Sequence, residues 1–269
     1  MKPLNSLLFV PASRPERIAK ALAAGADAVI VDLEDAVAPA DKDSARAALA
    51  AALDSARPVV VRVNAADTTW FPADLELLAH PGIAAVVLPK AEHAEDVAVV
   101  HHAAGGKPVL PLIESALGFE QRRALAHAEG VQRLVFGHID FQADMGMRAT
   151  EDDLLPFRVA LVLASRLADI AAPIDSVTTV LDDEALLRAD ALRARRLGFG
   201  GKLCIHPRQV AVVNACFTPG ADEIAWARRV IAADAAAGGA AVAVDGKRVD
   251  KPVVLSAQAI LTEAAARMP

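Results

Sequence analysis

Short runs of Val, Ile and Leu recur along the chain and alternate with longer segments whose apolar residues repeat at helical spacing. Runs that are apolar at nearly every position are typical of parallel strands buried on both faces. We expect strands at 6–11, 27–35, 58–64, 84–90, 108–114, 133–140, 173–177 and 201–207. We expect helices at 14–25, 41–54, 72–79, 92–104, 118–128, 154–170, 183–197 and 207–216.

This alternation favours an α/β fold of the (β/α)₈ type, the TIM barrel, which typically takes ~250 residues. An open doubly wound sheet is the alternative. No expected strand runs into a G-x-G-x-x-G turn, whereas polar residues stand at the ends of nearly all of them. Because barrel active sites gather at the carboxyl ends of the strands, such a ring of polar groups suits a barrel mouth. We therefore predict a catalytic barrel over residues 1–218.

The chain continues beyond the eighth expected helix with a segment that a barrel does not need. It comprises a helix at 222–237, the alternating run AVAVDGKRVDKPV and a last helix at 255–267. The pair Asp245-Gly246 is a hairpin-turn signal, and it places Asp250 just beyond a short ribbon. We expect residues 219–269 to form an arm that acts as a lid or crosses to a neighbouring subunit.

Composition bounds the class of protein. The 269 residues are 54% hydrophobic and carry a formal net charge of −6, which suits a globular protein and argues against a nucleic-acid or anionic-membrane surface. No run approaches the ~18 to 20 apolar residues that a membrane span needs, and the N-terminus fails as a signal peptide. Cys204 and Cys216 are too few for a disulfide framework. We expect a cytoplasmic protein whose partners are small molecules or other protein chains.

Two carboxylates carry the most specific chemical signal. Glu114 and Asp140 end two apolar runs of the same kind, PVLPLIE and RLVFGHID, so both should emerge at one rim of the barrel. A single acid at a strand end often only caps the next helix, but two in matched positions favour a divalent cation such as Mg²⁺. Gly137 within the second run predicts close approach of backbone or ligand, and Ser115 and Gly118 after the first run are small enough to let a ligand approach.

Arg62 is an unusual residue for a buried strand, because its guanidinium stays charged and must find an anion. One interpretation is an internal salt bridge with Glu34 or Asp35. The other is a substrate carboxylate, which matches the planar fork of arginine. Glu34 and Asp35 are accordingly either additional metal-positioning or water-positioning groups, or partners of Arg62 and Lys90.

Lys90 raises the question of Schiff-base chemistry, which needs a desolvated, neutral lysine. Its setting, PKAEHAED, is acidic and favours the protonated amine instead. His206, before Pro207, is either a ligand-binding group or simply the end of the last strand.

Several stretches together resemble one family over essentially the whole chain. They are SLLFVPASRPER, DAVIVDLEDAV, VVVRVN, VVLPKAE, LIES, LVFGHIDFQADMG, LGFGGKLCIHPRQV and GKRVDKPV. In order and spacing they resemble the citrate lyase β-subunit-like proteins of the aldolase superfamily that also holds the malyl-CoA and citramalyl-CoA lyases.

The resemblance implies a TIM-barrel lyase, a homotrimer or a hexamer of trimers, that uses Mg²⁺, or Mn²⁺ in its place. It implies cleavage or formation of a carbon–carbon bond beside a CoA thioester, with an acyl-CoA and a 2-oxoacid as ligands. Glu114 and Asp140 would hold the metal, and Arg62 would grip the substrate. Asp250 would move a proton in a neighbouring subunit's site.

Arg14 and Lys90 are further candidates for the CoA or carboxylate side of the substrate. One departure from the family is His138 in FGHID, where relatives more often carry a small or acidic residue, and this bears on the shape near the metal. Rival interpretations are a class II aldolase on a CoA-free 4-hydroxy-2-oxoacid, a thioesterase or synthase, and a non-catalytic acyl-binding subunit of a lyase complex. Sequence alone does not choose among acyl groups that differ by a few atoms.

Overall fold

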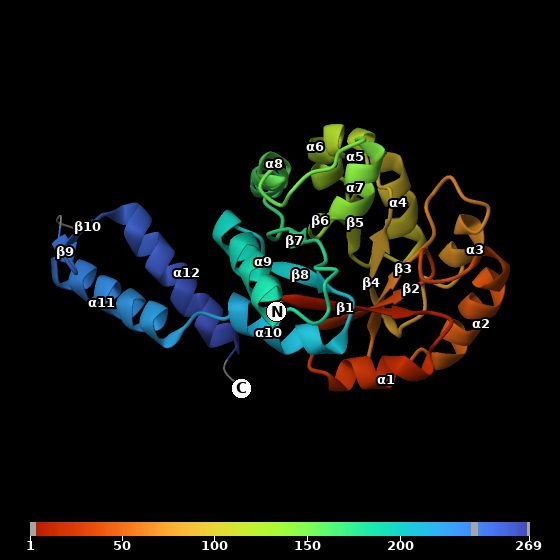
Figure 1. The fold of residues 1–269 in the computed structure, drawn as a ribbon, viewed down its shortest axis with the longest axis horizontal. Helices are drawn as coiled ribbons and strands as arrows, with labels where there is room; N and C mark the ends of the chain where they lie inside the picture. Colours follow the sequence, from red (N-terminus) through yellow and green to blue (C-terminus); the bar gives the residue numbers. More distant parts are fainter. Residues whose placement is uncertain (1–3, 238–241, 268–269) are drawn as a thin grey trace. The chain divides into compact units, whose positions relative to one another are not determined.

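Eight parallel strands close into a barrel in sequence order, as the alternation of apolar runs predicts (Figure 1). In this computed structural model, residues 4–237 and 242–267 are described. The strands are β1 (Ser6–Pro11), β2 (Ala28–Asp32), β3 (Val59–Arg62), β4 (Ile83–Leu88), β5 (Val109–Ile113), β6 (Val135–Phe136), β7 (Ile174–Asp175) and β8 (Gly201–Cys204). Pairing of β1 with both β2 and β8 closes the ring, so the open doubly wound sheet is excluded.

Helices follow the strands and cover the outside of the barrel. They are α1 (Glu16–Ala23), the short 3₁₀ helix η1 (Pro39–Asp41), α2 (Lys42–Ala52), α3 (Phe71–Leu75), α4 (Ala94–Ala103), α5 (Ala116–Glu120), α6 (Arg122–His127), α7 (His138–Asp144), α8 (Leu155–Leu167), α9 (Glu184–Leu197) and α10 (Pro207–Phe217). The single helix expected at 118–128 is divided into α5 and α6 at Gln121.

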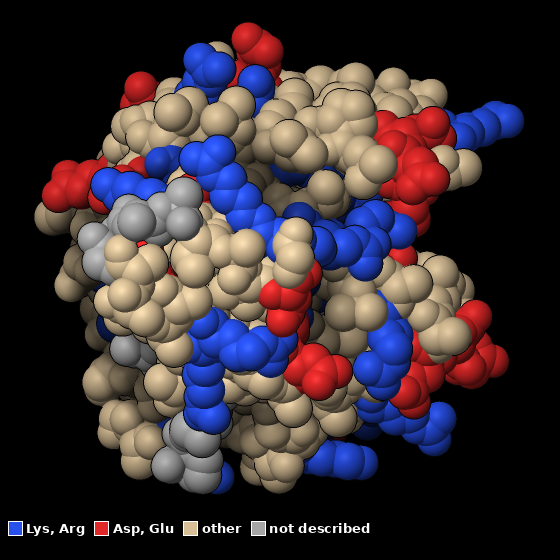
Figure 2. Space-filling view, turned by 90° about the vertical axis from the view of Figure 1, so that its left-hand side faces the viewer, with Lys and Arg blue, Asp and Glu red and all other residues tan. Residues whose placement is uncertain are grey.

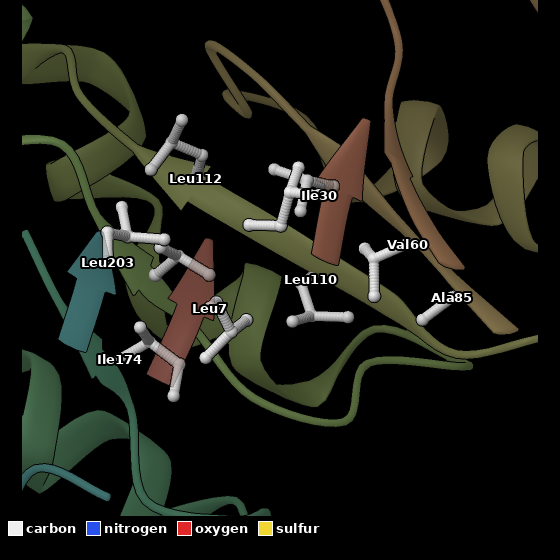
Figure 3. Packing of buried hydrophobic residues seen from close by; sticks show 10 residues of the cluster. Leu7, Ile30, Val60, Ala85, Leu110, Leu112, Ile174 and Leu203 are labelled. Carbon is white, nitrogen blue, oxygen red and sulfur yellow. The ribbon is translucent and has the colours of Figure 1, made fainter. Parts of the chain in front are cut away.

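The barrel interior is filled by apolar side chains from all eight strands. Figure 3 shows part of this cluster, whose buried members are Leu7, Ile30, Val60, Ala85, Val87, Leu110, Leu112, Val135, Ile174 and Leu203. Because successive side chains on a strand point to opposite faces, the residue two positions after an interior residue also faces inward. Asp32, Arg62, Glu114 and Ser176 stand in that relation to Ile30, Val60, Leu112 and Ile174. The same alternation that builds the core therefore directs polar groups into the mouth above it.

The expected strand at 133–140 is the main error in the prediction. Only Val135 and Phe136 are paired as a strand, and the chain then turns at Gly137 into α7, which begins at His138. Asp140 consequently lies in the first turn of a helix and not at the end of a strand. The apolar run could not reveal this, because residues that enter a buried helix look the same as residues of a buried strand.

The C-terminal unit is a helical hairpin capped by a small β-ribbon. Compact units divide between Asn214 and Ala215, within α10. The second unit contains α11 (Ala221–Ala237), β9 (Val242–Val244), β10 (Lys247–Val249) and α12 (Lys251–Arg267). Asp245 and Gly246 have φ of 52° and 74°, the left-handed pair that an Asp-Gly hairpin turn requires, so this prediction is confirmed. Asp250 follows β10 directly, as expected, and its carbonyl accepts a hydrogen bond from the Val254 amide of α12.

Charged side chains of both signs are interspersed over the face seen in Figure 2. The whole chain carries 34 Asp and Glu against 28 Lys and Arg. In the described part of the chain, none of the helices combines the length and the apolar character that crossing a bilayer would demand.

Candidate active site at the barrel mouth

A cavity of about 380 Å³ opens at the carboxyl ends of the barrel strands. Its polar lining consists of Asp32, Asp35, Arg62, Glu114, Asp140 and Ser176, and its apolar lining includes Phe9, Leu112, Val177, Leu203 and Ile205. The residues come from both halves of the barrel, so closure of the ring is what brings them together. This is the place where a (β/α)₈ fold carries its chemistry.

Glu114 is a buried carboxyl group at the end of β5, with only 3% of its surface exposed. Its Oε1 accepts a hydrogen bond of 2.8 Å from the backbone amide of Lys90, a residue held at φ 45°. Burial raises the pKa of Glu114 to about 8, although this hydrogen bond and the charge of Arg62 act in the opposite direction. A buried carboxyl group with one fixed oxygen is suited to bind a cation that reaches it from the cavity.

Gly137 makes the position of Glu114 sterically feasible. A Cβ built on Gly137 would lie 2.6 Å from Oε2 and 2.7 Å from Cβ of Glu114, closer than real contacts allow. The close approach at this glycine is made by the side chain of Glu114, where the sequence predicted backbone or a ligand. At Gly118 the close neighbour is backbone and not a ligand. A Cβ on Gly118 would lie 2.5 Å from the carbonyl oxygen of Ala91.

We expect Gly137→Ala to destabilise the protein by about 1–3 kcal/mol, the usual effect of overpacking, and to displace the Glu114 carboxylate. Thermal unfolding and metal affinity of the purified variant would measure both effects. Gly220→Ala is the matched control, because its new Cβ would meet nothing closer than Glu223 Oε2 at 3.7 Å. Equal unfolding temperatures and metal affinities for the two variants would contradict this assignment.

Asp140 reaches the same cavity from the first turn of α7 and is exposed to solvent. Its charge lies near enough to Glu114 to act against ionisation of that carboxyl group. The two acids that the sequence placed on one rim thus line one cavity, although one of them is carried by a helix.

Arg62 forms the internal ion pair that was one of its two interpretations. Its Nε and Nη2 donate to the two oxygens of Asp32, each at 2.7 Å, and its Nη1 lies 2.9 Å from Glu34 Oε2 and 3.4 Å from Asp35 Oδ2. The guanidinium also lies over the ring of Phe9 at 4.9 Å. These carboxylates outweigh the effect of burial and raise the pKa of Arg62.

Asp32 is one of two polar residues of the cavity lining that the sequence prediction missed, the other being Ser176. Asp32 is 1% exposed and is the direct partner of Arg62 in the register of β2 and β3. It also accepts hydrogen bonds from the amides of Glu34 and Ala36, so it fixes the loop that follows β2. An aspartate and an arginine that each end a neighbouring buried strand were the signal that could have revealed the pair.

Comparison with known proteins now decides the family. The profile of the HpcH/HpaI aldolase/citrate lyase family matches residues 5–207. The chain belongs to this family. A citrate lyase subunit beta-like protein of Deinococcus radiodurans is 37% identical over 97% of this chain and 98% of its own. A (3S)-malyl-CoA thioesterase of Cereibacter sphaeroides is 36% identical over 98% of this chain and 95% of its own.

A solved structure agrees with this assignment. The protein CitE from Mycobacterium tuberculosis, in complex with magnesium, acetoacetate and coenzyme A, matches with a TM-score of 0.87 and 38% identity over 98% of each chain. The resemblance inferred from the sequence motifs is therefore confirmed, and the chain is a member of an enzyme family of aldolases and lyases.

The donor set of this family member fits a hard divalent cation. Among residues 4–237 and 242–267, no group of three or more His, Cys, Asp and Glu side chains is arranged to enclose a metal by itself. Mg²⁺ does not need such an enclosure, because it is usually held by one or two carboxylates while water and substrate complete its shell. Glu114 and Asp140, with open cavity beside them, meet that requirement.

Lys90 lies beside the cavity with its side chain half exposed, and its Nζ is 3.2 Å from Glu34 Oε1. Burial works against its charge, but the neighbouring carboxylates, Glu34 first, outweigh this and raise the pKa of Lys90. The protonated amine expected from its acidic setting is the result, which disfavours Schiff-base chemistry. The contacts of Glu34 and Asp35 likewise favour their interpretation as partners of Arg62 and Lys90.

The remaining candidates lie outside the cavity lining. Arg14, in the loop after β1, is exposed and pairs with Glu16 at 2.9 Å. His206 accepts a hydrogen bond from the Arg208 amide in the turn after β8. Asp250 lies in the C-terminal unit, whereas the cavity is formed by residues of the barrel unit alone.

Proposed function

We propose that this protein is a Mg²⁺-dependent carbon–carbon lyase. Its substrate is a 3-hydroxyacyl-CoA that carries a further carboxylate, such as citramalyl-, malyl- or citryl-CoA, and its products are acetyl-CoA and a 2-oxoacid. The observation that carries the proposal is the convergence of Glu114, Asp140 and Arg62 on one cavity at the barrel mouth. The family, and a relative in complex with magnesium, acetoacetate and coenzyme A, support it.

In this proposal Glu114 and Asp140 hold the cation. Composition supports the assignment, because the ionisable residues of the cavity lining are the acids Asp32, Asp35, Glu114 and Asp140 against Arg62 alone. An anionic substrate would be repelled by this excess of carboxylates, and a divalent cation offsets it. When bound, Mg²⁺ supplies Lewis acidity that lowers the pKa of the substrate hydroxyl and polarises the oxoacid carbonyl, worth several kcal/mol.

Arg62 orients the substrate carboxylate. Asp32 holds two of its nitrogens, so the guanidinium is fixed in place before the substrate arrives. One donor remains for the substrate, because Nη2 has a second N–H beyond the one given to Asp32, whereas Nη1 already faces Glu34 at 2.9 Å and Asp35 at 3.4 Å. Lys90 and Arg14 supply positive charge for the CoA or carboxylate side of the same substrate.

Arg62→Lys is expected to lower kcat/KM by about 10- to 100-fold, because a lysine keeps the charge but loses the fork, and charge-assisted hydrogen bonds contribute about 1.5–3 kcal/mol each. Steady-state kinetics would measure this, and Mn²⁺ affinity should stay near that of the unaltered protein. A kcat/KM equal to that of the unaltered protein would remove Arg62 from the substrate site.

Asp250 supplies the proton in the last step. Cleavage leaves an electron pair on the carbon beside the thioester carbonyl, and this carbon must be protonated to give acetyl-CoA. A positioned acid contributes about 10²- to 10⁴-fold in rate. We assign this role to Asp250 of a neighbouring subunit in a homotrimer or a hexamer of trimers, with the hairpin of β9 and β10 and the start of α12 holding it.

The products distinguish this function from its main rival. Hydrolysis of the thioester is the second candidate, because a relative over nearly the full chain is a (3S)-malyl-CoA thioesterase. Malyl-, citramalyl- and citryl-CoA would each be supplied with Mg²⁺, and free thiol and oxoacid would be followed separately. A lyase releases oxoacid without free thiol, and a thioesterase releases thiol without oxoacid. Turnover of only a CoA-free 4-hydroxy-2-oxoacid, or no turnover, would contradict the proposal.

A further inference from the structure

His138 joins α7 to the residue that follows strand β7 through two contacts with one oxygen atom. It is the first residue of α7, and Asp140 lies two positions later in the same turn. The backbone amide of His138 donates to Ser176 Oγ at 3.1 Å, and the ring Nδ1 of His138 pairs with the same Oγ. His138 and Ser176 are 8% and 2% exposed, so water competes little for these hydrogen bonds.

The other edge of the His138 imidazole faces the carboxylate of Glu151. Its Nε2 lies 3.7 Å from Glu151 Oε1, and Glu151 Oε2 is paired with Arg158 Nη2 at 2.8 Å. Arg158 in turn donates from Nε to Asp175 Oδ1 at 2.9 Å. Asp175 is the neighbour of Ser176 in the chain, so Glu151 and Arg158 connect the end of β7 to the edge of the imidazole that faces away from Ser176.

Ser176 supplies a hydrogen-bond acceptor that the first turn of α7 lacks. The helix has seven residues, and its N-cap, Gly137, offers no side chain to cap it. The first amides of a helix have no partner within the helix, and a glycine before them leaves the backbone free to reorient. Ser176, the residue after β7, takes over the capping role, because its Oγ accepts from the first of these amides.

Asp140 depends on that turn for its orientation. Within the described residues, its side chain has no hydrogen bond or ion pair, and it is exposed. Glu114, by contrast, is fixed by burial and by the Lys90 amide. The distance between the two carboxylates therefore depends on the backbone of α7, which carries Asp140, because the Glu114 side chain is already fixed.

We propose that His138 and Ser176 are positioning residues that set the first turn of α7 and thereby place Asp140 opposite Glu114 for the cation. This inference rests on the proposed function. Neither residue contacts the cation or the reacting atoms in this account. Both act through Asp140.

The test is Mn²⁺ affinity of the full chain, measured by electron paramagnetic resonance without substrate. Ser176→Ala and His138→Ala should weaken binding by about 10-fold or more, since partners that orient metal ligands typically affect affinity by about 10- to 100-fold. In kinetics, the Mg²⁺ concentration for half-maximal rate should rise while kcat at saturating Mg²⁺ returns close to that of the unaltered protein. General loss of structure would lower kcat at every Mg²⁺ concentration.

Conservative variants keep the proposal testable if an alanine variant fails to fold. Ser176→Thr retains the oxygen, and His138→Asn places a polar atom near the Nδ1 position, so both should bind Mn²⁺ almost as the unaltered protein does. His138→Gln reaches the Nε2 position instead and should bind weakly. Ser165→Ala is the matched control, because Ser165 is a buried serine of α8 whose Oγ has no partner within the described chain.

The outcomes separate this inference from the proposed function. Unchanged Mn²⁺ affinity in Ser176→Ala and His138→Ala, together with a loss in Asp140→Ala, would overturn the positioning role and leave the metal site intact. A reversed order of His138→Asn and His138→Gln would also overturn it. Absence of Mn²⁺ binding by the unaltered protein would instead overturn the proposed function, and the positioning role with it.

Discussion

Replacing Glu114 with alanine is expected to lower kcat/KM by about 1000-fold or more. The variant loses the buried ligand of the cation, whose Lewis acidity is worth several kcal/mol, and each 1.4 kcal/mol corresponds to about tenfold in rate. Glu114→Gln should lose a similar amount, although its amide oxygen can still accept the hydrogen bond from the Lys90 backbone. Steady-state kinetics with Mg²⁺ would measure both variants.

Glu120→Gln is the control for this comparison. It makes the same change of charge on α5, where Glu120 is exposed and lies outside the cavity lining. Its kcat/KM and Mn²⁺ affinity should match those of the unaltered protein. If Glu114→Gln were equally active, or if excess EDTA left the unaltered protein fully active, the cation would have no part in the reaction.

Asp250→Ala is the second change with a large expected effect. It should lower kcat by about 10²- to 10⁴-fold, the contribution of a positioned general acid, while Mn²⁺ affinity stays unchanged because both ligands belong to the barrel unit. Asp245→Asn, in the turn of the same hairpin, should leave kcat unaltered, because asparagine tolerates the left-handed backbone of that position. Loss of metal binding in Asp250→Ala would contradict the assignment of metal binding to the barrel unit and of proton transfer to Asp250.

Mixing two inactive variants tests whether subunits share sites. If Asp250 serves a neighbouring barrel, then Asp250→Ala and Glu114→Ala subunits that are dissociated and reassembled together should recover part of the activity, because some mixed sites combine an intact barrel with an intact arm. Each variant reassembled alone is the control and should remain inactive. Absence of recovery in mixtures proven to be hetero-oligomers would place Asp250 in its own subunit's site or outside any site.

The barrel could be predicted from sequence because its strands are buried on both faces and therefore appear as continuous apolar runs. The polar residues that end these runs indicated the mouth, since the alternation that buries Ile30 and Leu112 also turns Asp32 and Glu114 inward. The hairpin before Asp250 was equally accessible, because Asp245-Gly246 is a local signal that needs no tertiary contact.

The contacts that tune the site could not be predicted, because each depends on which strands become neighbours. Asp32 pairs with Arg62 only through the register of β2 and β3. His138 meets Ser176 only because β7 ends beside the start of α7. The helical turn that carries Asp140 was missed for a related reason, since the His138 amide at its start donates to Ser176 Oγ, and Ser176 is distant in sequence.

The most direct test of the account is the position of Mn²⁺ in crystals of the protein grown with an oxoacid, located by anomalous scattering. We expect a single strong peak at the barrel mouth, bonded to carboxylate oxygens of both Glu114 and Asp140 at about 2.0–2.3 Å. A cation bound elsewhere, or these two side chains turned apart with no peak between them, would contradict the account.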